Sequence, residues 1–153
     1  MKFILKAVVI VAAATVAGVA LAGQCPAGKS GTDVRADTGA PAKGVTDTVL
    51  TTIDVASEPT AIEGRSFRMR RLVIQPGGVV PWHRHGERPA IIYVQQGTIT
   101  EYASSCSVPI VHRAGEATAE LHNTSHWWKN TGKTPAILIS SDLLKVGADG
   151  KMM

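Results

Sequence analysis

The stretch GGVVPWHRHGERPAIIYVQQG (residues 77–97) contains two histidines, His83 and His85, separated by a single residue. The segments on either side of the Gly86–Pro89 turn are rich in β-branched, apolar and aromatic residues, and the whole stretch is bounded by Gly77 and Gly97, which is typical of two short strands. Residues two apart in a strand project from the same face. Both imidazoles therefore face one point, and neutral imidazole is the commonest protein ligand of Zn, Cu, Fe and Ni.

A third histidine follows in a second segment, where ten residues separate it from Gly115 and three residues separate it from Asn130. Seven positions in the two segments resemble the two motifs of the cupin superfamily, G-x5-H-x-H-x3-4-E-x6-G and G-x5-P-x-G-x2-H-x3-N: Gly77, His83, His85, Gly97, Gly115, His126 and Asn130. The resemblance covers residues 45–142. It implies an all-β fold, the cupin-type double-stranded β-helix, which is a small jelly-roll-like barrel. It also implies that His83, His85 and His126 bind a metal ion inside that barrel.

The sequence departs from the cupin pattern at the carboxylate of the first motif. In the motif six residues separate the Glu from the final Gly, which places it at Ala90 of this chain, and Glu87 lies out of step in the preceding turn. The Pro-x-Gly turn of the second motif is replaced by residues 121–123. Three nitrogen ligands remain, as in catalytic zinc sites and as in the thiol dioxygenase branch of the cupins, which uses iron. We therefore expect a divalent transition metal, and Fe, Mn, Ni and Zn stay open.

Five further side chains are candidates for the pocket or for contacts that support the ligands. His122 precedes His126 by four residues, and Glu101, like Glu120, lies on a neighbouring strand. Trp128 and Asn130 are in phase with His126, so we expect both to point inward. For each of these residues an ordinary surface or packing role is the alternative. Arg88 could bind an anionic substrate if it reached the mouth of the barrel, and a solvated turn arginine is its alternative.

Short strands separated by Gly and Pro turns make up the rest of the domain, which we place at residues 46–145, and they predict a sandwich or barrel. The expected strands are 48–55, 67–75, 79–85, 90–96, 98–103, 108–113, 126–130 and 135–141. The turn Pro76-Gly77-Gly78 separates the second strand from the third.

The N-terminus has the pattern of a secretory signal peptide, which we place at residues 1–22. Lys2 and Lys6 form a basic start, residues 7–22 are apolar, and Ala20-Leu21-Ala22 fits an A-x-A cleavage site. A membrane anchor is the alternative, but this run is shorter than the ~20 apolar residues that span a bilayer. We therefore expect a periplasmic or secreted protein that has no membrane segment after cleavage. Residues 23–45 then form an extended arm, and residues 146–153 form a tail.

The chain has two cysteines, Cys25 in the arm and Cys106 in a serine-rich loop. An exported protein meets an oxidising compartment, so we expect them to form an intramolecular disulfide. Two free thiols or an intermolecular bond are the alternatives.

The charge pattern does not predict a nucleic-acid-binding surface. The chain has 16 Lys and Arg against 12 Asp and Glu, a net charge of +4, without a dense basic tract. The segment closest to a basic tract has four arginines among apolar residues: Arg65, Arg68, Arg70 and Arg71. We interpret these arginines as a solvated strand face.

Two functions remain for a chain of this kind, because cupins include both enzymes and binding proteins. The first is a metal-dependent enzyme, an oxygenase of the dioxygenase type, that acts on a small organic molecule. The second is a non-catalytic periplasmic protein that binds a metal or a small molecule. The intact histidines favour the first and Ala90 favours the second. A structural β protein without metal is a third interpretation, and a homodimer is left open.

Overall fold

The computed structural model describes residues 24–147, so the expected signal peptide and most of the expected tail lie outside the described residues. None of the helices in this part of the chain is long and apolar enough to cross a membrane. The elements are β1 (Lys43–Asp54), the short 3-10 helix η1 (Val55–Ser57), β2 (Arg65–Arg84), β3 (Ala90–Gln96), β4 (Thr98–Ala103), β5 (Ile110–Arg113), β6 (Ala117–Glu120), β7 (Ser125–Lys129) and β8 (Ala136–Lys145).

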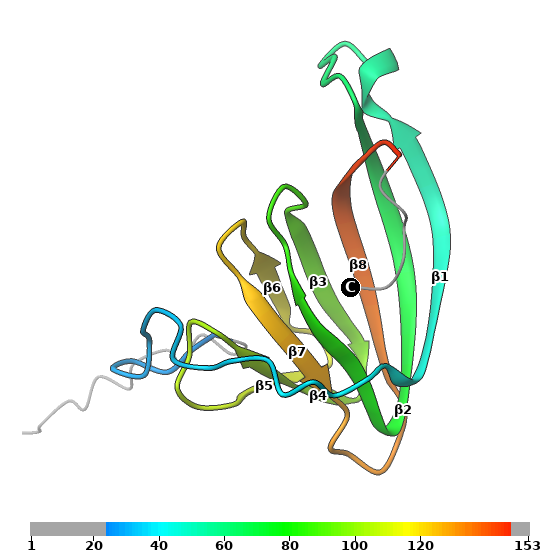
Figure 1. The fold of residues 1–153 in the computed structure, drawn as a ribbon. Helices are drawn as coiled ribbons and strands as arrows, with labels where there is room; N and C mark the ends of the chain where they lie inside the picture. Colours follow the sequence, from blue (N-terminus) through cyan, green and yellow to red (C-terminus); the bar gives the residue numbers. More distant parts are fainter. Residues whose placement is uncertain (1–23, 148–153) are drawn as a thin grey trace, which may run out of the picture.

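All strand pairs are antiparallel, and they form two layers that share β2 (Figure 1). The N-terminal half of β2 pairs with β1 and β8, and β8 continues through β3 to β6. The C-terminal half of β2 pairs with β7, which continues through β4 to β5. The layers diverge from the lower end of β2 in the view of Figure 1. This arrangement confirms the predicted all-β cupin-type double-stranded β-helix.

Two strand predictions were wrong in detail. The predicted break at Pro76-Gly77-Gly78 lies inside the single 20-residue strand β2. Hydrogen bonds from Gly77 N to Asn130 O and from Asn130 N to Gly78 O hold this segment against the end of β7, and Gly77 adopts φ 73°, which a glycine tolerates best. The short strand β6 was not predicted, because ATAE has little β-branched or aromatic character.

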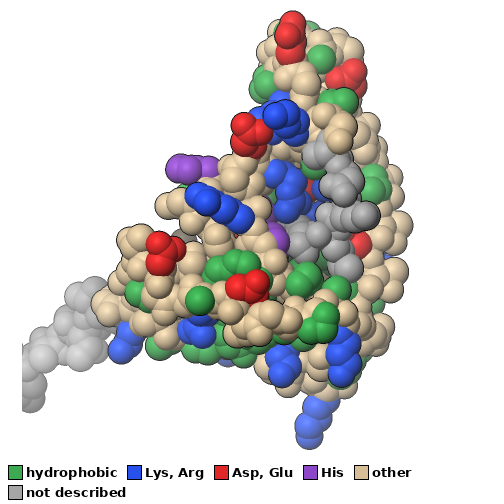
Figure 2. All heavy atoms as spheres, in the orientation of Figure 1, with side chains coloured by type: hydrophobic (Ala, Val, Ile, Leu, Met, Phe, Trp, Pro, Cys, Tyr) green, Lys and Arg blue, Asp and Glu red, His purple; other side chains and the backbone are tan. Residues whose placement is uncertain are grey.

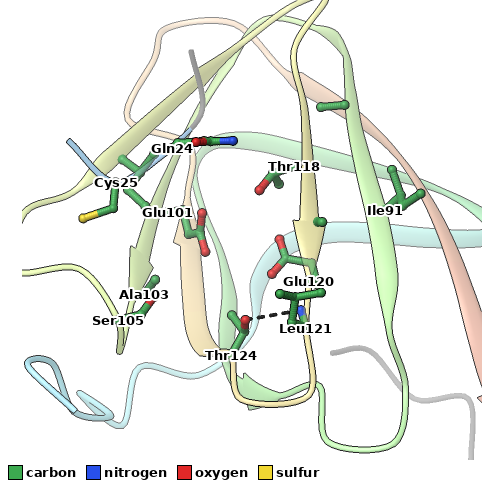
Figure 3. Close-up of a pocket in the computed structure, with 13 residues that line it drawn as sticks. Gln24, Cys25, Ile91, Glu101, Ala103, Ser105, Thr118, Glu120, Leu121 and Thr124 are labelled. Atoms are coloured by element: carbon green, nitrogen blue, oxygen red, sulfur yellow. Dashed lines mark hydrogen bonds between the residues drawn. The ribbon is translucent and has the colours of Figure 1, made fainter. Parts of the chain in front are cut away.

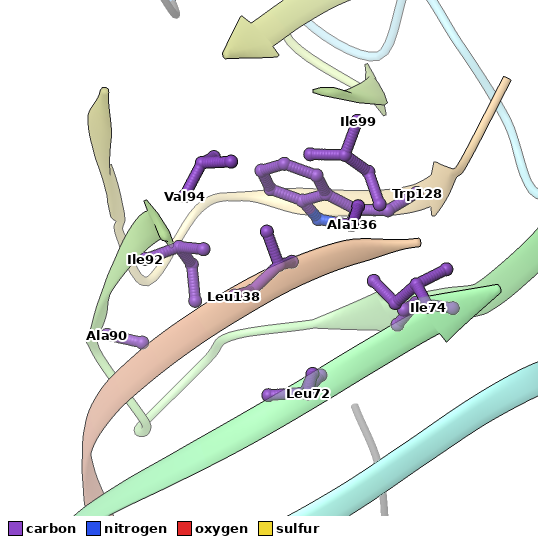
Figure 4. Close-up of a cluster of buried hydrophobic side chains, with 10 residues drawn as sticks. Leu72, Ile74, Ala90, Ile92, Val94, Ile99, Trp128, Ala136 and Leu138 are labelled. Atoms are coloured by element: carbon purple, nitrogen blue, oxygen red, sulfur yellow. The ribbon is translucent and has the colours of Figure 1, made fainter. Parts of the chain in front are cut away.

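The apolar core lies between the two layers (Figure 4). Leu72 and Ile74 come from β2, Leu138 comes from β8, and Trp128 contributes the largest buried side chain from β7. Gly97 allows β3 to turn closely into β4, because a Cβ atom there would lie 2.8 Å from the carbonyl oxygen of Pro135. The core therefore fixes β2 and β7 against each other, and these strands carry the motif histidines.

Two of the four clustered arginines are buried, which corrects the predicted solvated strand face. Arg68 is 4% exposed and Arg70 is fully buried, because they share strand parity with Leu72 and Ile74. Asp142 on β8 accepts hydrogen bonds from Arg68 at 3.0 and 2.7 Å and from Arg88 at 2.9 Å, and it lies 3.4 Å from Arg70. Figure 2 shows the exposed Lys and Arg side chains of one face in several separate groups.

The predicted disulfide is present and ties the N-terminal arm to the loop after β4. Cys25 and Cys106 are bonded, with their Cα atoms 5.7 Å apart, and Cys106 is fully buried. Backbone hydrogen bonds from Gly31 N to Ser105 O (3.0 Å) and from Val34 N to Ser104 O (2.9 Å) continue the attachment. The arm has few other buried contacts, so we expect the disulfide to keep it in place.

Replacing both cysteines by serine is expected to release the arm. Trypsin should then cleave after Lys29 and Arg35 at least about tenfold faster, because cleavage follows the population of the open segment. Mass spectrometry of timed digests measures both rates. Cleavage after Lys133, far along the chain, is the internal control. Equal rates at Lys29 in the native and Cys25→Ser/Cys106→Ser proteins would contradict this assignment.

Candidate metal centre

Strand pairing brings the three motif histidines together. His83 on β2 and His126 on β7 are directly opposed Cα partners, next to an irregularity in the β2–β7 register between Val80 and His83. His85 follows the end of β2, and its backbone N–H donates to Thr124 O at 3.1 Å. His85 and His126 are buried, and His83 is partly buried. The i, i+2 spacing and the cross-strand pair thus place three imidazoles at one point.

The three Nε2 atoms converge. They lie 3.2 Å apart between His83 and His85, 3.1 Å apart between His85 and His126, and 2.9 Å apart between His126 and His83. These three side chains form one of the two described groups whose ligand atoms all lie within 4.8 Å of one another.

The other ring nitrogens fix which atom of each imidazole carries the proton. The Nδ1 atoms of His83 and His85 each lie 2.9 Å from a backbone carbonyl oxygen, that of Pro81 and that of Arg88 respectively. His126 Nδ1 lies 2.7 Å from Glu101 Oε1. Since all three partners are acceptors, we infer that each Nδ1 carries the hydrogen and each Nε2 carries a lone pair. Three lone pairs facing one another suit a cation.

Burial keeps two of the histidines neutral. Burial and the charge of His126 lower the pKa of His83 from 6.5 to about 2. Burial and the charge of His126 also lower the pKa of His85 from 6.5 to about 4. Both imidazoles are therefore neutral at neutral pH, with one N–H each, and neutral imidazole is the form that binds metals.

The metal-free protein is expected to lose stability as the pH falls from 7 to 5. Unfolded chains take up protons on His83 and His85 near pH 6.5, whereas the folded protein does not until the pH approaches about 4 and about 2. This contribution is therefore fully present above pH 6.5 and is lost progressively as the pH falls below it, and we expect the free energy of unfolding to fall by about 4 kcal/mol, about 2 from each histidine. Urea denaturation after chelator treatment measures it. A His83→Gln/His85→Gln protein should lack most of this slope, and an equal slope in both proteins would contradict the prediction.

Glu101 joins the metal centre to His112. Its Oε1 accepts from His126 Nδ1, and its Oε2 accepts from His112 Nε2 at 2.8 Å. Burial alone would raise the pKa of Glu101, but the hydrogen bonds from the two histidines outweigh it and lower this pKa to about 2. His112 is fully buried and packs on Trp128, with ring centroids 4.7 Å apart. Glu101 is thus an ionised carboxylate that orients His126.

A second carboxylate, Glu120 on β6, lies beside the histidines. Its Oε2 is 3.3 Å from His126 Nδ1 and 4.0 Å from His85 Nε2. Burial and the negative charge of Glu101 raise the pKa of Glu120 well above its usual value. Glu101, Glu120 and His126 form the second described group of metal-ligand atoms within 4.8 Å of one another.

A cavity of about 540 Å³ opens between the layers next to these carboxylates. Figure 3 shows Glu101 and Glu120 projecting into it from facing strands, with Gln24 and Cys25 of the arm at its edge. Small side chains such as Ala103 and Thr118 line the walls. The cavity is large enough for a small organic molecule.

The other predicted site residues take different positions. Trp128 points inward, and its indole N–H donates to His126 Nε2 at 3.4 Å. His122 is exposed and belongs to neither group of ligand atoms. Asn130 is fully buried but points away from the histidines, because its amide donates to the carbonyl oxygens of Ile74 and Thr134. Arg88 is bound to Asp142 and does not line the cavity.

The structure gives His112 and Glu120 contacts that the sequence did not predict. His112 binds Glu101, which in turn binds His126, and Glu120 lies beside His126 Nδ1. Strand parity carries the missing signal in part, since His112 alternates with the exposed Val111 and Arg113. Pairing between β4 and β5, which sets Ile99 opposite His112, is not visible in the sequence.

Comparison with known proteins agrees with the fold. The Cupin_2 family model, a cupin domain, matches residues 70–142. The chain belongs to the cupin superfamily. Auxin-binding protein ABP19b of Prunus persica is 32% identical over 89 residues, which are 56% of this chain and 43% of that protein. The chain thus matches less than half the length of this curated relative.

Solved structures give the same result. An oxalate oxidase in complex with the substrate analogue glycolate is 26% identical with a TM-score of 0.51, and the match covers 77% of this chain and 65% of that chain. The cupin domain of Schizosaccharomyces pombe Cnp3 has a TM-score of 0.53 at 14% identity, with 70% and 66% covered. The latter likeness is one of fold.

Proposed function

We propose that this chain is an exported metal-dependent enzyme of the oxygenase type that acts on a small organic molecule. The observation that carries the proposal is the convergence of three Nε2 lone pairs, from His83, His85 and His126, beside an open cavity. Without a cation these three acceptors would share one donor, the Trp128 indole N–H at 3.4 Å from His126 Nε2, and such poorly satisfied burial is unfavourable.

The spacing of the nitrogens supports one shared ion. The three Nε2 atoms lie 2.9–3.2 Å apart, and neighbouring ligands of one ion bound at about 2.1 Å lie about 3 Å apart. His83, His85 and His126 would hold this ion, and Fe, Mn, Ni and Zn are the candidates.

The protein's own groups orient and shield such an ion. The carbonyl oxygens of Pro81 and Arg88 and the carboxylate of Glu101 hold the three rings through their Nδ1 atoms. Trp128 closes the side toward the apolar core. A bound transition metal would supply Lewis acidity and, for iron or manganese, redox chemistry toward dioxygen.

The lining of the cavity supports an uncharged or cationic substrate. The ionised carboxylate of Glu101 and the carboxyl group of Glu120, whose pKa is raised, face it, and the described residues that line it include no Lys or Arg. The one nearby guanidinium group of the metal-motif turn, Arg88, is bound to Asp142. A small molecule with several negative charges would therefore meet repulsion away from the metal.

Export to an oxidising compartment completes the proposal. The expected signal peptide at residues 1–22 supports it, and so does the disulfide between Cys25 and Cys106, since such bonds persist mainly in exported proteins. N-terminal sequencing of protein recovered from the periplasm or medium tests it, and the expected first residue is Gly23.

A non-catalytic binding protein is the second candidate, and Ala90 favours it, because the site lacks the carboxylate of the family motif. Metal analysis of untagged protein tests the shared premise of both candidates: about one transition-metal ion per chain is expected. Oxygen consumption by iron- and manganese-loaded protein with a panel of small molecules separates them. Turnover with any compound supports the enzyme, and binding without turnover across the panel supports the binding protein.

A further inference from the structure

The carboxylate that position 90 lacks is supplied to the same face by the neighbouring strand. Ala90 on β3 and Glu120 on β6 are directly opposed Cα partners in an antiparallel pair. Opposed residues project from the same face with their Cβ atoms about 5 Å apart. Ala90 is buried, and its small side chain leaves room for Glu120 to extend over it toward the histidines.

Glu120 has no adequate partner in its own surroundings. The residue is 1% exposed, and its Oε1 has no hydrogen-bond partner among residues 24–147. Its Oε2 lies 3.3 Å from His126 Nδ1, but that nitrogen has one hydrogen, which points to Glu101 at 2.7 Å. Buried carboxylates are normally hydrogen-bonded, paired or bound to a metal. Glu120 is therefore a buried acid that lacks a donor and lies next to three metal-binding nitrogens.

We propose that Glu120 is the fourth protein ligand of the metal, from β6 instead of β3. The proposal rests on the proposed function, since it needs an ion on the three histidines. A ligand cis to His85 would lie about 3.0 Å from its Nε2, and Glu120 Oε2 is at 4.0 Å. A shift of the carboxylate by about 1 Å makes up the difference, and the cavity beside Glu120 gives it room to move.

Glu101 does not compete for this role. Both of its oxygens accept hydrogen bonds from histidines, at 2.7 Å from His126 and at 2.8 Å from His112. Turning it toward the metal would break both bonds. The two carboxylates therefore have different roles: Glu101 positions His126, and Glu120 is the metal ligand.

The test compares Mn²⁺ and Co²⁺ affinity, by chelator competition, in the native protein and four variants. Glu120→Gln is expected to weaken binding at least about tenfold and to change the visible spectrum of bound Co²⁺, which reports coordination geometry. The exposed-carboxylate control Glu87→Gln should match the native protein. Ala90→Glu/Glu120→Ala returns a carboxylate to β3 and should recover most of the affinity that Glu120→Ala loses.

Each result supports or overturns the ligand assignment. Native affinity and an unchanged Co²⁺ spectrum in Glu120→Gln would overturn it, and so would two ions per chain, which would point to a separate site on Glu101, Glu120 and His126. Melting of the metal-free variants shows whether a loss of affinity comes from misfolding, because Glu120→Gln should melt no lower than the native apoprotein. If the native protein binds neither ion, the proposed function itself fails.

Discussion

His126→Ala is expected to lose nearly all bound metal. The side chain supplies one of three converging nitrogens and is itself held by Glu101, so its removal leaves two histidine ligands and frees the carboxylate that orients the site. We expect the affinity for Mn²⁺ or Co²⁺ to fall at least about a hundredfold. The rise in melting temperature on adding metal should disappear with it, because only a ligand that binds the folded state stabilises it.

His122→Ala is the matched control for this variant. It also removes one histidine, four residues away, but His122 is exposed and belongs to neither group of ligand atoms. Elemental analysis of untagged, desalted proteins should show full metal content in His122→Ala and little in His126→Ala. Full occupancy in His126→Ala would place the ion elsewhere.

Asp142→Ala is expected to destabilise the protein by about 3–5 kcal/mol. Asp142 is fully buried and accepts hydrogen bonds from Arg68 and Arg88, with Arg70 also nearby. Removing one partner of a buried ion cluster leaves charges that are neither paired nor solvated. Arg70 keeps Asp47, whereas Arg68 and Arg88 lose the carboxylate. Urea denaturation of the metal-free proteins measures the change.

Glu87→Gln is the control for Asp142→Ala. Glu87 is 69% exposed in its side chain and makes surface ion pairs with Arg65 and Lys145 at 3.7 and 3.4 Å, so we expect a change below about 0.5 kcal/mol. A similar loss in both variants would show that burial of the cluster does not matter.

The contribution of Asp142 should also depend on pH. Burial alone would raise its pKa, but the hydrogen bond from Arg68 and the charges of Arg70 and Arg68 outweigh burial and lower it. Its stabilising effect is therefore present above the usual aspartate pKa and is lost as the pH falls through the lowered value. The difference in stability between the native protein and Asp142→Ala should shrink in that acidic range.

Local rules predict most strands and the His83–His85 pair, whereas the cupin fold and the place of His126 were predicted from the resemblance to the two cupin motifs. Alternation and Gly turns mark most strands, and the i, i+2 spacing sets His83 and His85 on one side of the chain. Gly97 marks the turn from β3 to β4, and Gly77 marks a position within β2, where the backbone has positive φ, 80° and 73°. These signals need no knowledge of which strands pair.

Long-range pairing decides what the sequence could not predict. Glu120 lies beside the histidines because β6 pairs with β3 and sets Glu120 opposite Ala90, which is thirty positions earlier in the sequence. Arg68 and Arg70 are buried because Asp142 arrives on β8 from a segment more than 70 residues later. Asn130 matches the family motif, but its amide fastens the β7–β8 turn to β2. Its role follows from a backbone arrangement that spacing alone does not reveal.

Strand β2 belongs to both layers, and this slows the folding of the chain. The N-terminal half of β2 needs β8, which pairs Arg65 with Lys145, and its C-terminal half needs β7, which pairs His83 with His126. Both pairings join residues far apart in sequence, so closing these loops costs entropy before many contacts form. Chains dominated by such contacts fold in milliseconds to seconds. The histidine cluster therefore forms only after nearly the whole domain is available, and a truncation before β8 should abolish metal binding together with folding.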